Sequence, residues 1–172
     1  MEKMAKFEKV SFGVFKEACE KLCPELSLDE ITAAYESIKL PRRATKGSAG
    51  YDFFSPLSLQ SGIKKGDAFT FPTGVRCKMK EGWVLVICPR SGMGFKTGIH
   101  LANTVGGIDQ DYYYSDNEGH IMVKLVNDAS LARDIEIHWG DAICQGLFLP
   151  FGIAEGDDAQ KSRNGGFGST GK

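Results

Sequence analysis

Short β-type runs separated by glycine turns are the feature that most constrains this chain. The clearest candidate strands, all after Pro41, are residues 68–71, 83–88, 121–126, 134–139 and 143–149. Turn signals such as Glu81-Gly82 and Gly140-Asp141 lie between them, and no helical periodicity is interleaved. This pattern predicts an all-β fold, an antiparallel jelly roll or β-barrel.

The first 40 residues have a different pattern, which predicts helices. Phe12, Phe15 and Cys19 recur at helical spacing, and Pro24 ends that segment. A capping box from Ser27 to Glu30 begins a second helix. We therefore expect a short N-terminal α-helical extension over residues 1–39 that packs against the rest of the chain and carries no chemistry.

Charge and cysteine content exclude several classes of function. The 172 residues carry a net charge of −1, so we expect neither nucleic acid nor a membrane surface as a partner. Every apolar run is far shorter than the roughly 20 residues that span a bilayer. The five cysteines form no CxxC pair, which favours free, buried thiols in a reducing compartment, and we expect a cytoplasmic protein.

The C-terminal residues are rich in glycine and hydroxyl groups. Gly165 to Gly171 follow Arg163 and include one aromatic ring, Phe167. Composition alone favours a flexible tail. The same residues also suit a lid over a nucleotide, because glycine lets backbone amides approach an anion closely and an aromatic ring can stack on a base.

Four glycine-flanked segments inside the β region carry candidate chemistry. They are residues 49–52 (AGYD), 89–96 (PRSGMGFK), 103–112 (NTVGGIDQDY) and 140–146 (GDAICQG). The guanidinium of Arg90 and the hydroxyl of Ser91 suit phosphate oxygens. Asp109 can activate a water or hold a metal through water, and an extended backbone would point Asp111 the same way. Asn103 offers the donor and acceptor that base recognition requires.

Taken in order with the tail, these segments resemble the five motifs of the homotrimeric dUTPase family. The resemblance covers residues 40–172, and the N-terminal helices suggest a Gram-positive bacterial or phage subgroup. It implies a β domain over 40–158, with a C-terminal arm over 159–172 that closes the active site. The implied activity is hydrolysis of dUTP to dUMP and pyrophosphate, which limits uracil in DNA and supplies dUMP for dTMP synthesis. Each site of the implied homotrimer draws on three subunits.

The resemblance also implies roles for residues at the reacting end of the substrate. Asp109 would orient the water that attacks the α-phosphate in line. Mg²⁺ would be bound through the phosphates and water, with no direct protein ligand and with Asp52 as an outer-shell contact.

The implied substrate-binding residues divide by the part of dUTP that they contact. Tyr112 would pack under the deoxyribose and exclude a 2′-hydroxyl, while Asn103 and the backbone around Gly107 would read uracil. The residues implied for the phosphates are Arg90, Ser91, Gly92 and Gln145, joined from the arm by Arg163, Gly168, Ser169 and Thr170. Phe167 would stack on the base.

Three departures from the family pattern stand out. Only Asn164 separates Arg163 from Gly165 in the last motif, and Ala142 replaces a common arginine in the fourth. The insertion Tyr113–Gly119 lengthens the connection after the third motif.

Two other functions remain open from the sequence. One is a dCTP deaminase-related activity, which needs a general acid/base carboxylate at the amino-bearing carbon of the base, and no motif supplies one. The other is a regulatory binding protein on the same scaffold. We expect His100, His120 and His138 to be surface residues.

Overall fold

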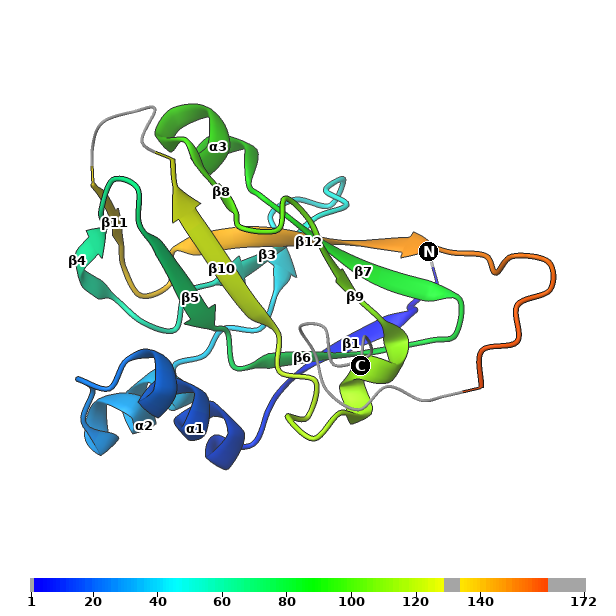
Figure 1. The fold of residues 1–172 in the computed structure, drawn as a ribbon, viewed down its shortest axis with the longest axis horizontal. Coiled ribbons are helices and arrows are strands. Elements are labelled where there is room, and N and C mark those ends of the chain that lie inside the picture. The colour runs from blue at the N-terminus through cyan, green and yellow to red at the C-terminus, as the bar shows by residue number, and fades with distance from the viewer. Residues whose placement is uncertain (1, 129–133, 161–172) are drawn as a thin grey trace.

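The computed structural model describes residues 2–128 and 134–160 (Figure 1). The helical elements are α1 Phe12–Leu22, α2 Leu28–Glu36, α3 Ser91–Thr97 and the 3₁₀ helix η1 Gln110–Tyr114. The strands are β1 Ala5–Lys9, β2 Arg42–Arg43, β3 Tyr51–Phe54, β4 Leu59–Ile63, β5 Ala68–Pro72, β6 Val75–Met79, β7 Trp83–Cys88, β8 Ile99–Leu101, β9 Gly106–Ile108, β10 Met122–Asn127, β11 Ile135–Ile137 and β12 Ala142–Pro150. The fold is mostly β, as the sequence predicts.

The described strands pair antiparallel in several small sheets. The largest has the order β2-β3-β12-β7-β9, and a second has the order β5-β10-β8. The pairs β1-β6 and β11-β4 complete the set. Since β8 and β9 follow one another in the chain but belong to different sheets, the segment between them crosses from one sheet to the other.

β12 lies in the middle of the largest sheet and sets its register. Gly146 of β12 stands opposite Tyr51 of β3 and Ile87 of β7. A Cβ atom at Gly146 would lie 2.8 Å from Leu85 and 2.9 Å from Phe53. Glycine therefore lets two fully buried side chains close over the centre of the strand.

The helices α1 and α2 pack side by side, and α1 packs against β5 (Figure 1). The capping box at Ser27 forms as predicted, because the Ser27 hydroxyl and the Glu30 carboxylate each bond the other's backbone N–H. Phe15 and Ile38 reach Gly74, whose φ of 69° suits glycine and whose missing Cβ leaves them room. Helix and sheet side chains therefore share one apolar cluster.

Two sequence expectations were wrong. Residues 5–9 form β1, a strand paired with β6, where a helical segment was expected. His120 is 2% exposed instead of lying on the surface. The expectation of free thiols is confirmed: the cysteines are unpaired, and all except the partly exposed Cys88 are buried. None of the described helices is long and apolar enough to cross a membrane.

The buried His120 accepts a hydrogen bond from the Gly74 backbone N–H through Nε2, at 2.8 Å. An imidazole nitrogen that accepts this bond carries no proton, so the bond requires the neutral ring. Burial lowers the pKa of His120 to about 4, and the nearby Glu118 carboxylate offsets only part of that effect.

We predict that acid destabilises the fold through His120. The unfolded chain binds this proton below about pH 6.5, whereas the folded chain binds it only near pH 4, so the free energy of unfolding falls as pH drops. The loss is about 2 kcal/mol at pH 5 relative to pH 7. Urea unfolding of the wild type and of His120→Gln, at fixed protein concentration, checks this. Gln accepts the same bond without titrating, so equal pH dependence in the two proteins would refute the assignment.

Candidate functional site

A polar cluster forms where β3, β7 and β12 lie side by side. The Arg90 Nε donates to Asp52 Oδ1 at 3.0 Å, and Arg90 Nη1 donates to the Ala142 carbonyl at 3.3 Å. Gln145 stands opposite Asp52 on β3 and opposite Cys88 on β7, and its amide donates to the Pro89 carbonyl at 3.1 Å. Residues of the first, second and fourth glycine-flanked segments therefore meet beside one end of β7 and β12, and they fix the direction of the Arg90 guanidinium.

The segment after Arg90 presents an exposed surface. Ser91 and Gly92 begin α3, with Arg90 as its N-cap, and both residues are exposed. Phe95, on the same helix, is 92% exposed. The start of α3 is therefore open to solvent beside the Arg90 cluster.

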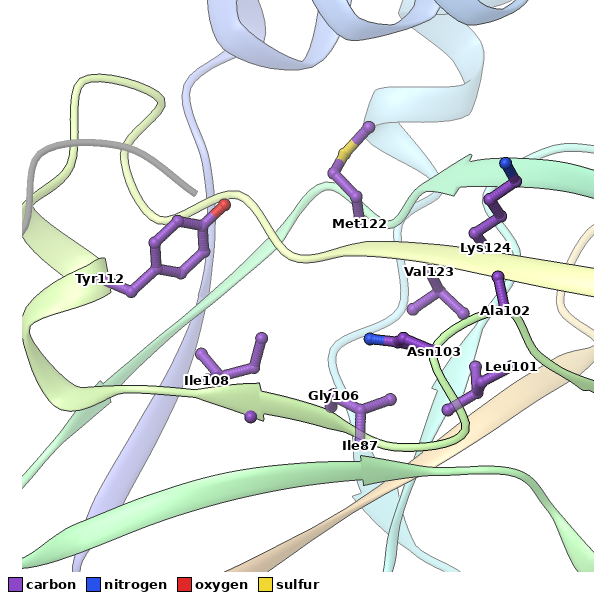
Figure 2. A pocket seen from close by; sticks show the side chains of 11 residues that line it. Ile87, Leu101, Ala102, Asn103, Gly106, Ile108, Tyr112, Met122, Val123 and Lys124 are labelled. Atoms are coloured by element: carbon purple, nitrogen blue, oxygen red, sulfur yellow. The ribbon is translucent and has the colours of Figure 1, made fainter. Parts of the chain in front are cut away.

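A cavity of about 330 Å³ lies between β9 and β10 (Figure 2). Asn103, Gly107 and Tyr112 line it, together with the apolar side chains of Ile87, Ile108 and Val123. Figure 2 shows the Asn103 amide pointing into this space, with Tyr112 at its far end. Small-molecule sites are commonly apolar cavities of this size with a few placed polar groups.

The backbone turn after Asn103 shapes one wall of this cavity. The left-handed residue of the turn is Thr104, with a φ of 64°, while Gly106 and Gly107 lie within β9. The glycines are thus part of the strand that follows the turn. A Cβ atom at Gly106 would lie 3.4 Å from the Asn103 amide nitrogen, whereas one at Gly107 would meet nothing within 4 Å.

Asp109 follows β9 directly and is exposed at the start of η1. Its backbone is extended, with a φ of −74° and a ψ of 156°. Asp111, by contrast, lies inside the 3₁₀ helix, so the expected common extended backbone for the two carboxylates was wrong. Of these two carboxylates, only Asp109 directly follows β9, the strand that borders the cavity.

The register of β7 and β9 separates Asp109 from Arg90. Leu85 pairs with Ile108, which places Asp109 level with Val84, six residues before Arg90. A strand rises about 3.3 Å per residue, so the two positions differ by about 20 Å along β7. One chain thus presents the cavity with Asp109 at one place and the Arg90 cluster at another.

Some expected site residues cannot be placed. Five of them lie outside the described residues, namely Arg163, Phe167, Gly168, Ser169 and Thr170. Residues that the sequence reasoning missed are the apolar lining of the cavity and Asn117, whose amide donates to the Tyr112 hydroxyl at 2.8 Å. No local sequence signal marks these positions, since tertiary packing brings them together.

Within residues 2–128 and 134–160, no group of three or more His, Cys, Asp or Glu side chains converges to hold a metal ion. The carboxylates next to the two candidate regions are Asp52, which pairs with Arg90, and the exposed Asp109. Each region offers a single carboxylate, which suits a hard cation that would take most of its ligands from phosphate and water, as Mg²⁺ does.

The dUTPase family model matches residues 36–171, which is most of the chain. This chain belongs to the dUTPase family. It is 39% identical over 147 residues to the deoxyuridine 5′-triphosphate nucleotidohydrolase of Lactococcus lactis, covering 83% of this chain and 95% of that one.

Solved dUTPases have a similar fold. The crystal structure of the dUTPase from Streptococcus mutans is 37% identical, with a TM-score of 0.62 over 70% of this chain and 91% of that one. The dUTPase of Staphylococcus bacteriophage 80alpha, solved with dUPNHPP, is 19% identical with a TM-score of 0.62 and covers 99% of this chain and 100% of that one. At that identity the similarity concerns the fold alone.

We predict that Gly50→Ala in this dUTPase-family chain disturbs the polar cluster without unfolding the protein. The new Cβ would lie 2.4 Å from Gln145 Oε1, so the flexible amide must move and lose its bond to Pro89. Affinity for inorganic tripolyphosphate, measured by calorimetry, should fall about twofold to tenfold, which corresponds to one hydrogen bond.

Gly47→Ala is the matched control, because a Cβ there meets nothing within 4 Å. Tripolyphosphate affinity of Gly50→Ala equal to that of Gly47→Ala would show that the Gln145 side chain contributes nothing to anion binding.

Proposed function

We propose that this chain hydrolyses dUTP to dUMP and pyrophosphate. The observation that carries the proposal is a single segment, 103–112, that lines the cavity with Asn103, Gly107 and Tyr112 and places Asp109 at the cavity's border. Base recognition, sugar recognition and a candidate water-orienting carboxylate are thus held by one strand and its flanking turns. The relatives' shared name as deoxyuridine 5′-triphosphate nucleotidohydrolases supports the same reaction.

The cavity suits a pyrimidine and its sugar. The Asn103 amide supplies one donor and one acceptor, and the open backbone at Gly107 supplies further hydrogen bonds to the edge of uracil. The Tyr112 ring forms the end wall, is 5% exposed, and would pack under the deoxyribose. A rigid wall at this point leaves no room for a ribose 2′-hydroxyl.

Asp109 would orient the attacking water. A carboxylate at a strand end has a fixed backbone and an exposed head group, so it can accept a proton from water while the substrate occupies the cavity. In-line attack on the α-phosphate then releases pyrophosphate as the leaving group. This reaction limits uracil in DNA and supplies dUMP for dTMP synthesis.

The Arg90 cluster would hold the departing phosphates. Asp52 and the Ala142 carbonyl fix the guanidinium, which then presents its remaining donors to phosphate oxygens. Ser91, Gly92 and Gln145 would add contacts from the same edge. Ala142 stands where the family commonly has an arginine, and it contributes only its backbone carbonyl, which accepts from Arg90.

Mg²⁺ would be held by the three phosphates and water, with Asp52 as an outer-shell contact. When bound, it neutralises phosphate charge and aligns the chain of phosphates for displacement. The residues of this chain bind the base and sugar, orient the water and fix the guanidinium.

We further propose a homotrimer whose active sites combine residues from different subunits. The backbone levels of Asp109 and Arg90 differ by about 20 Å along the sheet, which favours a site that takes the two residues from different copies. Residues 151–160 are exposed and run away from the sheets in Figure 1, with Phe151 and Ile153 uncovered. A neighbouring subunit would bury these side chains.

The division of the chain into a β domain, an N-terminal extension and a C-terminal arm is part of the same proposal. Residues 40–158 would form a jelly-roll β domain, with 1–39 as an N-terminal extension and 159–172 as an arm over the neighbouring site. On that arm, Phe167 would stack on uracil, and Arg163, Gly168, Ser169 and Thr170 would contact the phosphates.

We predict that Asp109→Asn binds dUTP and turns it over 10²- to 10⁴-fold more slowly, the usual cost of removing a general base. Pyrophosphate release with Mg²⁺, measured against dUTP, UTP, dCTP and dTTP, checks both the substrate and the residue. Wild-type turnover by the variant would exclude Asp109 as the water-orienting group. Ammonia released from dCTP by the wild type would indicate a deaminase instead.

We predict that two inactive variants complement each other. Asp109→Asn and Arg90→Ala, co-expressed with different tags and purified through both tags as mixed trimers, should regain about a third of wild-type activity, because one site of the three in each mixed trimer takes an intact Asp109 and an intact Arg90 from different copies. Either variant alone is the control. If mixed oligomers stay as inactive as the single variants, Asp109 and Arg90 act from the same chain.

A further inference from the structure

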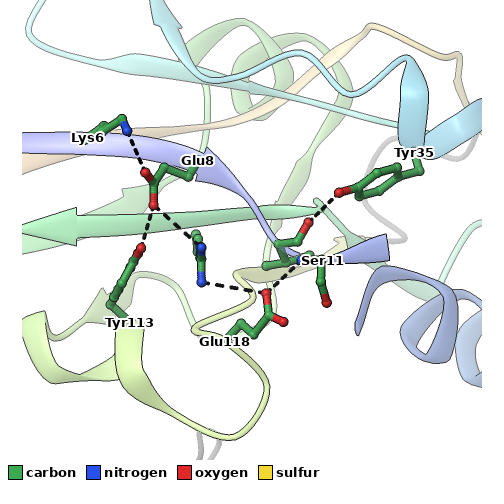
Figure 3. A network of polar contacts seen from close by, with 8 residues as sticks. Lys6, Glu8, Ser11, Tyr35, Tyr113 and Glu118 are labelled. Carbon is green, nitrogen blue, oxygen red and sulfur yellow. Dashed lines mark hydrogen bonds and ion pairs between the residues drawn. The ribbon is translucent and has the colours of Figure 1, made fainter. Parts of the chain in front are cut away.

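The insertion Tyr113–Gly119 is joined to the N-terminal segment. Glu118 accepts a hydrogen bond from the Ser11 backbone N–H at 2.7 Å. Its other neighbour is Arg76 of β6, with Nη1 3.7 Å from the same carboxylate oxygen. Ser11 is also the N-cap of α1, so one side chain of the insertion contacts the start of that helix. Figure 3 shows Glu118 reaching from the insertion to Ser11.

A second contact joins the insertion to β1. The Tyr113 hydroxyl donates to Glu8 Oε2 at 2.5 Å, and Arg76 Nε lies 3.7 Å from the same oxygen. The Arg76 guanidinium lies 4.6 Å from the centre of the Tyr113 ring. Arg76 therefore lies within ion-pair distance of two carboxylates, one on β1 and one on the insertion, and links both segments to β6.

Both carboxylates are held in their charged form. The pKa of Glu118 lies below its ordinary value, chiefly because Ser11 donates to it. The pKa of Glu8 is lowered chiefly by Lys6 and then by the Tyr113 hydroxyl. The contacts between the insertion and the N-terminal segment thus persist across the neutral pH range.

The same insertion holds the end wall of the substrate cavity. Asn117 Nδ2 donates to the Tyr112 hydroxyl at 2.8 Å, and that hydroxyl donates to the His120 carbonyl at 2.8 Å. Asn117 Oδ1 accepts from the Gly119 N–H at 3.2 Å, which closes the turn. At Gly119 a Cβ would lie 2.7 Å from the Tyr113 Cα, so the turn packs directly on the tyrosine segment.

We infer that β1 and the insertion act together as a clamp that fixes Tyr112, and that Asn117 and Tyr113 are positioning residues for discrimination between deoxyribose and ribose. The inference rests on the proposed function. A ring whose hydroxyl is held by Asn117 and the His120 carbonyl cannot tilt to admit a 2′-hydroxyl. Loosening the clamp frees the Tyr112 ring to admit the ribose, while the backbone of Asp109 stays joined to β9 before it and to η1 after it, where its carbonyl accepts from the Tyr112 N–H at 3.2 Å.

Two variants remove single contacts of the clamp. Asn117→Asp keeps the acceptor for Gly119 and loses the donor to Tyr112, and Tyr113→Phe keeps the ring beside Arg76 and loses the bond to Glu8. Each should lower the ratio of kcat/KM for dUTP to that for UTP by about threefold to tenfold, the effect of one hydrogen bond. The fall in this ratio should come from changed KM values, and kcat for dUTP should stay within about twofold of wild type.

Two controls are matched to these variants. Ser115→Ala, in the same connection, removes a buried hydroxyl that has no hydrogen-bond partner among the described residues. Glu2→Gln changes an exposed ion pair with Lys80 at the other end of the β1 pairing. Both should keep the wild-type ratio. An unchanged ratio in Asn117→Asp and Tyr113→Phe, or an equal fall in Ser115→Ala, would overturn the inference.

Amide hydrogen exchange over residues 112–121, without substrate, separates this inference from the proposed function. Asn117→Asp and Tyr113→Phe should speed exchange there at least threefold relative to Ser115→Ala. If the wild type fails to hydrolyse dUTP, the proposed function is wrong, and the exchange data still decide whether the clamp exists. Exchange equal to that of the control would show that it does not.

Discussion

β12 lies between β3 and β7, and that pairing determines where the polar side chains of the protein can meet. The strand crosses the core only because Gly146 leaves space for Leu85 and Phe53, which close over it from the neighbouring strands. One residue before Gly146, Gln145 is opposite Asp52 on one side and Cys88 on the other. The Arg90 cluster is therefore a consequence of backbone register, and its geometry depends on a glycine in the core.

The same sheet also explains why one chain holds two separate functional regions. β9 pairs with the outer side of β7, and it carries the cavity and Asp109 toward the beginning of β7, while Arg90 follows the end of that strand. Antiparallel pairing of short strands makes this separation unavoidable. In the proposed trimer, association of subunits brings the two regions to one substrate, and the exposed side chains of Phe95 and Phe151 are candidates for burial there.

The sequence predicts the local elements well and the long-range ones poorly. The runs at Trp83–Cys88 and around Ile143 form β7 and β12, short apolar stretches with one face buried in the core and the other half-buried. β1 escaped prediction because Ala5–Lys9 is short and polar, and its strand character comes from pairing with β6, some 70 residues away. His120 escaped for the same reason, since its burial depends on Phe15 and Gly74. The site motifs were assigned through their resemblance to the dUTPase family, and the roles of their residues stay predictions, whereas Asn117 bonds Tyr112 through a fold that no local pattern shows.

The position of the attacked phosphorus tests the central claim most directly. Wild-type protein should be incubated with dUTP and Mg²⁺ in H₂¹⁸O, and both products should be analysed by mass spectrometry. Because Asp109 is proposed to orient water at the α-phosphate, the account predicts one ¹⁸O atom in dUMP and none in pyrophosphate. Label found in pyrophosphate, or no release of dUMP at all, would contradict it.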